Sequence, residues 1–264
     1  MVEIRNVDHA FGKNTSYHLE LFKNLSFTIN NGDFISLIGS NGAGKSTLLN
    51  MLAGAFIPDS GEIVIDNKNI TRQKEHIRAK YIGRVFQDPK VGTCPDMSIR
   101  ENLSIAFNKM KSFNLSRGVE RRNEVFFMDQ LETFEMGLEC FINTNAGLLS
   151  GGQRQALSLL MATITEPKLL LLDEHTAALD PVTSKTVMER TKEIVKAKKM
   201  TTLMVTHNLN FAIEYGNRLV LMHKGDVLLD VKGENKTSLT KQKLLDIFSN
   251  SVPDDALSDI MAFG

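Results

Sequence analysis

The sequence predicts an α/β protein built on a parallel sheet, and two observations lead to this prediction. First, three short apolar runs bounded by polar turns have the length of strands buried on both faces: FISLIG (34–39), KLLLLD (168–173) and TTLMVTH (201–207). Second, stretches with helical periodicity lie between these runs, including STLLNMLAG (46–54) and residues 184–199. Strands that alternate with helices indicate an α/β sheet.

The remaining segments depart from this alternation. VEIRNV, LFKNLSFTI and EIVID, near the N-terminus, are typical of short half-buried strands joined by Gly/Asn turns, so we expect an antiparallel β flap there. Residues 88–160 are mostly helical in pattern, and Ser98 followed by Glu101 predicts a capping box at the first helix start. The polar and then weakly helical stretch beyond Lys232 is expected to be an appendage.

Length and composition exclude several classes of protein. A chain of 264 residues with 42% hydrophobic residues can bury a large core. Its 31 basic and 31 acidic residues create no overall field toward nucleic acid, so we expect no nucleic-acid partner. Cys94 and Cys140 are too few for a disulfide framework and are expected to be buried in a reducing compartment. With neither a signal peptide nor an apolar run of membrane-spanning length, the sequence predicts a cytoplasmic protein.

The most specific chemical signal is GSNGAGKST at residues 39–47, which satisfies G-x-x-x-x-G-K-[ST] between a strand and a helix. Its glycines let the backbone wrap round phosphates, and the following helix N-terminus attracts an anion. Lys45 would reach the outer phosphates and Ser46 would bind Mg²⁺. The sequence therefore predicts that a nucleoside triphosphate binds with Mg²⁺; the family resemblance described below implies that it is ATP. The expected binding residues of this loop are Gly39, Asn41, Gly42, Ala43, Gly44, Lys45, Ser46 and Thr47.

A second signal is LLLLDEHTAALDP, in which a buried strand ends in two acids. The carboxyl ends of parallel strands face the crevice where α/β folds bind ligands. We therefore expect Asp173 to hold Mg²⁺ through its water shell and Glu174 to orient or deprotonate the attacking water. The alternative is that the acids only cap a helix, and the phosphate loop upstream argues against it.

A third segment, LLSGGQRQ at 148–155, resembles the signature motif of the ATP-binding cassette (ABC) ATPases. Gln87 stands where that family has its Q-loop glutamine, residues 178–180 match its D-loop, and His207 matches its switch histidine. The resemblance covers most of the chain and implies a P-loop NTPase with a RecA-like parallel-sheet core, an N-terminal antiparallel β flap and an inserted helical subdomain. It also implies one ABC ATPase domain spanning 1–264, made of a nucleotide-binding core (1–87 and 161–231), a helical subdomain (88–160) and a tail (232–264).

The resemblance also implies a dimer. Ser150, Gly151 and Gly152 form a second helix start that could bind a phosphate, together with Gln153. In the family, this signature closes over the ATP that a second cassette holds, in a head-to-tail arrangement. Because the chain has one copy of each motif, we expect a pair with a second copy of itself or with a similar cassette.

Roles for the other residues follow from the same resemblance. His207 would reach the γ-phosphate, Gln87 would touch Mg²⁺ or the attacking water, and Asp180 would belong to the nucleotide site. Lys45, Gln87, Glu174 and His207 form the expected catalytic set. Phe11 stands where the family has an adenine-stacking tyrosine, and Tyr17 is the alternative.

One residue departs from the family pattern, because His175 replaces a proline. The loss of that proline should loosen the turn, since a proline fixes φ. His175 is interpreted either as a group that hydrogen-bonds locally and faces the D-loop or as a titrating group beside Glu174.

The resemblance implies a transport ATPase subunit that lies peripherally on the cytoplasmic face of the cell membrane. Residues 89–102, with Val91, Cys94, Pro95 and Met97 as apolar lining, would contact a separate multi-span permease. The phrase DEHTAALDP is similar to that of importers with an extracytoplasmic solute receptor, some of which handle amino acids. The alternative is a soluble cassette that serves as an assembly factor, for instance for iron–sulfur clusters. A degenerate nucleotide-binding regulator is opposed by the intact motif residues.

Overall fold

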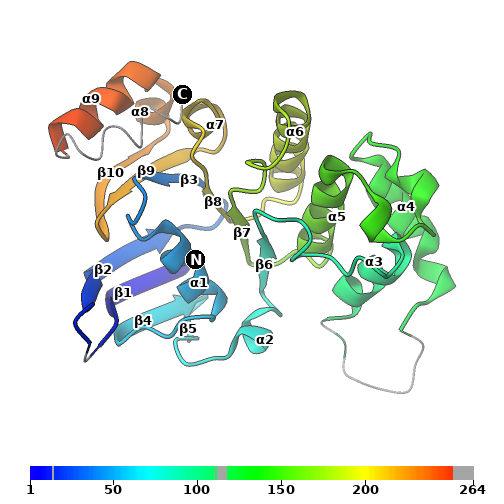
Figure 1. Cartoon of the computed structure of the whole chain (residues 1–264), viewed down its shortest axis with the longest axis horizontal. Coiled ribbons are helices and arrows are strands. Elements are labelled where there is room, and N and C mark those ends of the chain that lie inside the picture. Colours follow the sequence, from blue (N-terminus) through cyan, green and yellow to red (C-terminus); the bar gives the residue numbers. More distant parts are fainter. Residues whose placement is uncertain (14, 110, 112–117, 252–264) are drawn as a thin grey trace. The chain divides into compact units, whose positions relative to one another are not determined.

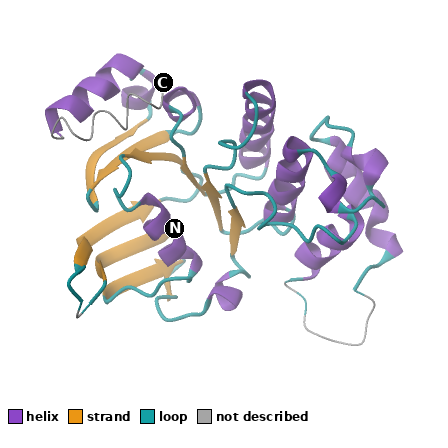
Figure 2. Ribbon diagram, viewed as in Figure 1, coloured by secondary structure: helices purple, strands orange, loops and turns teal. Residues whose placement is uncertain are grey.

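The computed structural model describes residues 1–13, 15–109, 111 and 118–251. The chain divides into two compact units. The first unit comprises residues 1–78 and 201–264, and the second comprises residues 79–200. Figure 1 labels the elements along the chain, and Figure 2 distinguishes helices, strands and loops.

An antiparallel sheet forms the N-terminal part of the first unit. In it, β1 (Val2–Phe11) lies between β2 (Leu19–Ile29) and β4 (Ser60–Ile65), and the short β5 (Lys68–Asn69) pairs with β4. The inward side chains of β1 are fully buried, as the half-buried pattern of the sequence requires. The predicted β flap is confirmed.

A second sheet in the first unit carries the phosphate loop. Here β3 (Phe34–Gly39) lies between β8 (Thr202–Val205) and β9 (Arg218–His223) and is parallel to both. All six residues of β3 are buried, which explains its continuous apolar run. The edge strand β10 (Asp226–Lys232) is antiparallel to β9. The sheet is therefore mixed, and the β9–β10 hairpin is not among the predicted strands.

The first unit contains five helices among its described residues. They are α1 (Lys45–Ala53), α2 (Glu75–Arg78), α7 (Leu209–Glu214), α8 (Glu234–Thr237) and α9 (Lys241–Ser251). Leu244 of α9 is fully buried in a cluster with Ile38 of β3 and Leu209 of α7. Lys236 of α8 donates to backbone carbonyls just after α7. The expectation that the tail is an appendage is wrong for its described part, because apolar residues of α9 complete this core.

The second unit combines two parallel strands with most of the longer helices. β6 (Ile82–Val85) pairs with β7 (Leu169–Asp173). Its helices and 3₁₀ turns are α3 (Ile99–Asn108), η1 (Arg121–Asn123), α4 (Glu124–Glu132), η2 (Leu138–Phe141), η3 (Ala146–Leu148), α5 (Gly151–Thr163) and α6 (Pro181–Ala197). The predicted capping box of α3 is present, with Ser98 and Glu101 each accepting from the other's backbone N–H. Helix α6 begins three residues earlier than expected because Asp180 caps it and Pro181 opens it.

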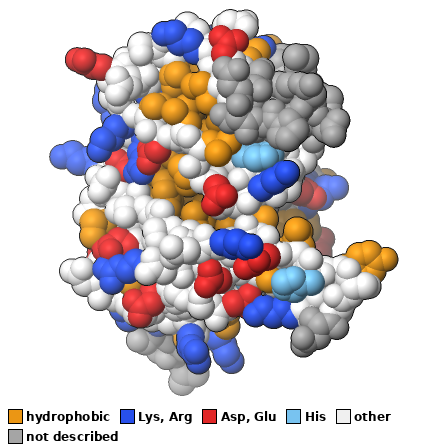
Figure 3. Space-filling view, turned by 90° about the vertical axis from the view of Figure 1, so that its left-hand side faces the viewer, with side chains coloured by type: hydrophobic (Ala, Val, Ile, Leu, Met, Phe, Trp, Pro, Cys, Tyr) orange, Lys and Arg blue, Asp and Glu red, His pale blue; other side chains and the backbone are white. Residues whose placement is uncertain are grey.

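Two surface properties bear on the sequence predictions. Cys94 and Cys140 are both exposed, so the expectation of buried cysteines is wrong. Cys94 lies in the loop before α3 and Cys140 in a 3₁₀ turn, where neither is covered by a neighbouring element. The face shown in Figure 3 carries acidic and basic side chains interspersed, as equal numbers of the two charges allow.

None of the helices formed by the described residues combines the length and the apolar character needed to cross a membrane.

Candidate functional site

The loop between β3 and α1 has the backbone of a phosphate-binding loop. Gly42 and Gly44 have φ of 75° and 100°, values that residues with a side chain rarely adopt. A Cβ on Gly39 would lie 2.1 Å from the carbonyl oxygen of Met222, and one on Gly44 would lie 2.7 Å from Cε1 of Phe22. No side-chain hydrogen bond caps α1, which suits the binding of an anion at this helix start.

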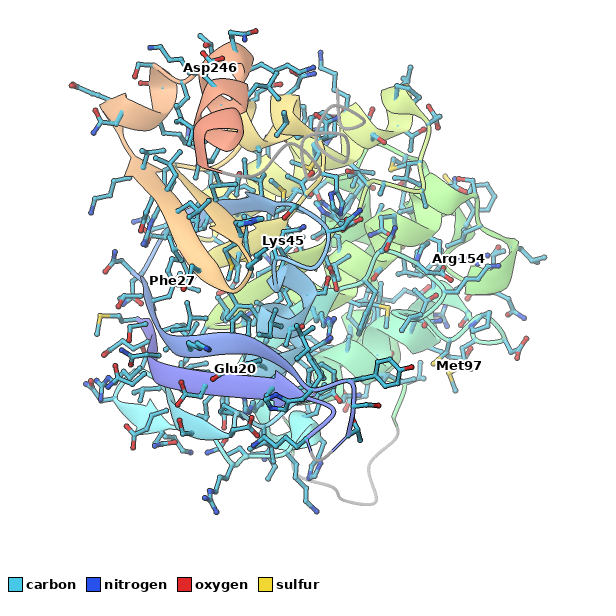
Figure 4. All side chains as sticks on the ribbon, turned by 60° about the vertical axis from the view of Figure 1, so that its left-hand side comes forward. Glu20, Phe27, Lys45, Met97, Arg154 and Asp246 are labelled. Atoms are coloured by element: carbon cyan, nitrogen blue, oxygen red, sulfur yellow. The ribbon has the colours of Figure 1, made fainter. Side chains whose placement is uncertain are left out.

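Lys45 lies at the first position of α1, where Figure 4 labels it. Its side chain is buried, and its Nζ donates to the carbonyl oxygens of Gly39 at 2.6 Å and Ser40 at 2.9 Å. The ammonium group is therefore held over the loop by the loop's own backbone. Ser46, the next residue, is exposed. The predicted phosphate-binding residues thus form one continuous structure around the start of α1.

The switch histidine lies at the same sheet edge as this loop. β3 and β8 are parallel, and Leu37 pairs with Val205. His207 comes two residues after the end of β8, on the edge of the sheet where the phosphate loop follows β3. Asn208 then caps α7 by accepting from the N–H of Phe211 at 3.0 Å, which fixes the chain direction just after the histidine. His207 and the phosphate loop thus follow the carboxyl ends of two neighbouring parallel strands of the first unit.

The two aromatic candidates lie in different environments. Phe11 ends β1 and is 36% exposed, and its ring centroid lies 4.8 Å from that of His9 and 5.8 Å from that of Phe56. Both neighbours meet it edge-on, so its orientation is constrained. Tyr17 is 85% exposed.

Strand β1 is also joined to the phosphate loop. His9 pairs in register with Phe22 of β2, and the ring of Phe22 packs against Gly44 of the loop.

In the second unit the same register argument applies to Gln87 and the acids. β6 and β7 are parallel, and Val85 pairs with Leu172. Two residues further on, Gln87 and Glu174 leave the same edge of the sheet. Gln155 of α5 donates from Nε2 to the carbonyl oxygen of Phe86 at 3.2 Å, so the signature helix is tied to the start of the Q-loop.

The carboxylate of Asp173 has a basic partner. Arg84 of β6 donates from Nη2 to Oδ2 of Asp173 at 3.0 Å, and its guanidinium lies 4.5 Å from the ring centroid of Phe86. Arg84 could not be identified from the sequence, because a single arginine in a short strand belongs to no motif. Glu174 follows with φ of 46°, a left-handed conformation that turns the chain sharply after β7.

His175 is buried in the second unit, and its imidazole contacts helix α6. It is 2% exposed, and its Nε2 lies 3.3 Å from Oγ1 of Thr191 on α6. The Thr191 hydroxyl donates to the carbonyl oxygen of Val187 at 2.7 Å, so Nε2 of the histidine must carry the proton that joins the pair. Burial lowers the pKa of His175 to about 4. The imidazole is therefore neutral, and its hydrogen bond goes to α6 rather than to the D-loop.

The signature segment forms a well-capped helix start. Ser150 and Gln153 form a capping box, with Gln153 N–H donating to Ser150 Oγ at 3.3 Å and Ser150 N–H donating to Gln153 Oε1 at 3.2 Å. Gly151 is exposed, whereas a Cβ on Gly152 would lie 2.3 Å from Cγ2 of Thr183 on α6. Gly152 thus permits close packing of α5 on α6, and the side chains of Ser150 and Gln153 serve the cap.

Asp180, the last residue of the D-loop, caps α6. Its Oδ1 accepts from the N–H groups of Val182 at 3.2 Å and Thr183 at 3.0 Å. The hydrogen bonds from Thr183 and then that from Val182 hold the pKa of the carboxyl below its usual range. The hydroxyl of Ser184 donates to the carbonyl oxygen of Thr176 at 3.0 Å and so fixes the turn that precedes the cap.

Comparisons with known proteins agree with these features. The ABC transporter family model matches residues 22–177. A tyrosine transport ATP-binding protein of Clostridioides difficile (strain R20291) is 47% identical over 253 residues, which cover 96% of this chain and 100% of the relative. The putative hemin import ATP-binding protein HrtA of Staphylococcus haemolyticus (strain JCSC1435) is 32% identical over 231 residues, or 86% of this chain and 99% of the relative.

The fold is similar to solved cassette structures. A dimeric structure of the ATP-binding cassette MJ0796, in a post-hydrolysis state with ADP and Pi, superposes with a TM-score of 0.74 and 31% identity, covering 88% of this chain and 98% of that one. The fold and the phosphate loop define an ATP-hydrolysing P-loop NTPase. The chain belongs to the ABC transporter family, as an ATP-binding subunit. The resemblance inferred from the motifs is thereby confirmed.

Proposed function

We propose that this ATPase energises a separate membrane permease for the uptake of a small solute, an amino acid. The observation that carries the proposal is the 47% identity to a tyrosine transport ATP-binding protein over that relative's whole length. In such importers the permease and its extracytoplasmic receptor select the solute. The similarity of the cassette to a tyrosine transport relative is therefore what indicates the class of solute. The cassette itself supplies the ATPase.

We assign nucleotide binding to residues of the first unit. The backbone N–H groups at the start of α1 and the ammonium of Lys45 hold the phosphates. Phe11 stacks on adenine, which its constrained and partly exposed ring supports. His207 contacts the γ-phosphate, and the parallel pairing of β8 with β3, the strand that leads into the phosphate loop, supports that role. Gly39, Asn41, Gly42, Ala43, Gly44, Ser46 and Thr47 complete the binding loop.

The donor chemistry of three residues fits Mg²⁺. Ser46 offers a hydroxyl, Gln87 an amide oxygen and Asp173 a carboxylate, and Mg²⁺ prefers hard oxygen ligands. Ser46 and Gln87 are exposed, and Asp173 keeps one carboxylate oxygen, Oδ1, besides the one that Arg84 contacts. When bound, Mg²⁺ would neutralise charge on the phosphate oxygens.

Hydrolysis is assigned to Glu174. Its carboxylate orients the attacking water and takes one proton from it as the water oxygen bonds to the γ-phosphorus. The bond from that phosphorus to the oxygen shared with the β-phosphate breaks, which yields ADP and phosphate. Gln87 orients the same water, and the parallel pairing of β6 with β7, after which Gln87 and Glu174 follow at the same edge of the sheet, supports this role.

We propose that two cassettes act as a head-to-tail pair, formed with a second copy or a similar chain. The dimeric cassette among the similar structures supports this arrangement. Gly151 would present its N–H to the ATP of the other cassette, with Ser150, Gly152 and Gln153 shaping the helix start. Asp180 would hold the D-loop beside that nucleotide.

Residues 89–102 are proposed to contact the permease at the cytoplasmic face of the membrane. Within this segment Val91 is 64% and Met97 40% exposed, and Cys94 and Pro95 are exposed as well. Figure 4 labels Met97. The loop is held from inside by buried Asn102, whose Nδ2 donates to the carbonyl oxygens of Cys94 at 3.0 Å and Met97 at 3.1 Å. An apolar surface on a rigid loop suits a docking helix of a permease.

The test is affinity capture of a Glu174→Gln variant from solubilised membranes with ATP present. Removing the carboxylate should stop hydrolysis and leave the ATP-bound pair closed, so the permease should co-purify in fixed proportion and its receptor should identify the solute. The matched control is the double variant Lys45→Ala/Glu174→Gln, which should not close on ATP. Recovery of soluble partners alone, with the protein absent from membranes, would instead support an assembly factor.

A further inference from the structure

The turn between β9 and β10 packs directly against the phosphate loop within the first unit. Gly39 approaches the carbonyl oxygen of Met222 so closely that a Cβ would lie 2.1 Å from it. The N–H of Gly225 donates to the carbonyl oxygen of Ala43 at 3.0 Å. Ser40 Oγ lies 3.1 Å from His223 Nδ1, a hydrogen bond between side chains. The turn therefore contacts the loop near its start, through Gly39 and Ser40, and further along at Ala43.

The backbone of the turn is fixed by its φ angles and by packing against β2. Lys224 and Gly225 have φ of 46° and 88°, and they join β9 to β10 as a two-residue hairpin in which His223 pairs with Asp226. A Cβ on Gly225 would lie 1.7 Å from the carbonyl oxygen of Leu21, so β2 confines the turn from the other side. The imidazole of His223 is thus carried on a rigid support.

Ser40 joins this support to the phosphate-binding lysine. Its carbonyl oxygen accepts from Nζ of Lys45 at 2.9 Å, while its hydroxyl meets His223. The same carbonyl oxygen also accepts from the N–H of Ala43 at 3.1 Å. The side-chain hydrogen bond to His223 holds the Cα and Cβ of Ser40 in place, and the carbonyl group that Lys45 contacts extends from this Cα.

We propose that His223 is a positioning residue for nucleotide binding: it holds Ser40 so that the start of the phosphate loop, and Lys45 with it, is arranged to receive phosphates. This inference rests on the proposed phosphate-binding role of residues 39–47. His223 acts through Ser40 and does not itself touch ATP.

The test is a double-mutant cycle with ATP affinity as the readout. The dissociation constant for ATP without Mg²⁺ is measured by calorimetry for Ser40→Ala, His223→Leu and the combined variant. Each single change should weaken binding about threefold to tenfold, the value of one hydrogen bond, and the combined variant should lose no more than either alone. His76→Leu, at an exposed site on α2, is the matched control and should bind as the wild type does.

Two further measurements separate positioning from a fault in folding. His223→Asn places an amide near the position of Nδ1 and should restore most of the affinity that His223→Leu loses. A fault in folding would lower the number of binding sites and leave the dissociation constant of the remaining protein unchanged. Losses from the two single variants that multiply, or unchanged affinity in His223→Leu, would overturn the inference. Unchanged affinity in Lys45→Ala would overturn the phosphate-loop role itself and this inference with it.

Discussion

Arg84 and Asp173 form an ion pair between neighbouring strands, with 3.0 Å between Nη2 and Oδ2. Their side chains are 14% and 16% exposed, so water and salt screen the pair only weakly. Phe86 covers the guanidinium. The arginine orients the carboxylate to which we assign Mg²⁺, and the pair also joins β6 to β7.

Replacing Arg84 by Met should therefore lower the free energy of unfolding, because the carboxylate of Asp173 would stay largely buried without its cation. We expect a loss of about 1–3 kcal/mol in urea denaturation at neutral pH. The exposed Arg72, changed to Met, is the control and should shift the free energy by less than about 0.5 kcal/mol. Equal losses for both variants would mean that the ion pair contributes nothing specific.

The buried His175 should make stability depend on pH. Burial lowers its pKa from 6.5 to about 4, so between these values the unfolded chain binds a proton that the folded chain does not. Its contribution is fully present above pH 6.5 and is lost as the pH falls toward 4, by roughly 3 kcal/mol in total. His175→Gln should flatten this part of the profile in denaturant titrations, whereas exposed His76→Gln should leave it unchanged. Identical pH slopes for wild type and His175→Gln would show that the pKa of His175 is the same in the folded and unfolded states.

Phe11 and Tyr17 can be separated by ATP affinity. Phe11→Ala should weaken ATP binding about tenfold, since it removes the ring proposed to stack on adenine. Phe11→Tyr should retain the affinity, because the ring face is kept. Tyr17→Ala should bind as the wild type does. The opposite order, with loss only in Tyr17→Ala, would move the adenine contact to Tyr17.

Lys236 should anchor the tail. Its Nζ donates to the carbonyl oxygens of Ile213, Tyr215 and Gly216 at 2.9, 2.6 and 2.8 Å. Lys236→Met would leave these acceptors at the end of α7 without the ammonium and should cost about 2–4 kcal/mol of unfolding free energy. Exposed Lys232→Met is the control. Proteolysis should also cut between α8 and α9 faster in Lys236→Met, and an unchanged rate would argue against an anchoring role.

Much of the fold could be predicted because its signals are local. The apolar run of β3, the glycines of the loop and the capping box of α3 each depend on residues close together in the chain, so their patterns are visible in one dimension. The β9–β10 hairpin and the packing of α9 were harder to predict from the sequence. The side chains of β10 alternate between exposed and half-buried, and α9 is weakly apolar, so neither gives a strong periodic signal.

The sequence by itself determined the family, the phosphate loop and the order of the motifs, because each motif is a short run of residues whose chemistry needs that spacing. Only the tertiary structure decided which residues support them. Arg84 reaches Asp173 across 89 positions and His223 reaches Ser40 across 183, and pairings at such separations are set by strand order and register. The same holds for His175, whose neutrality follows from burial against α6. Burial and long-range pairing are properties of the packed chain, and no local pattern encodes them.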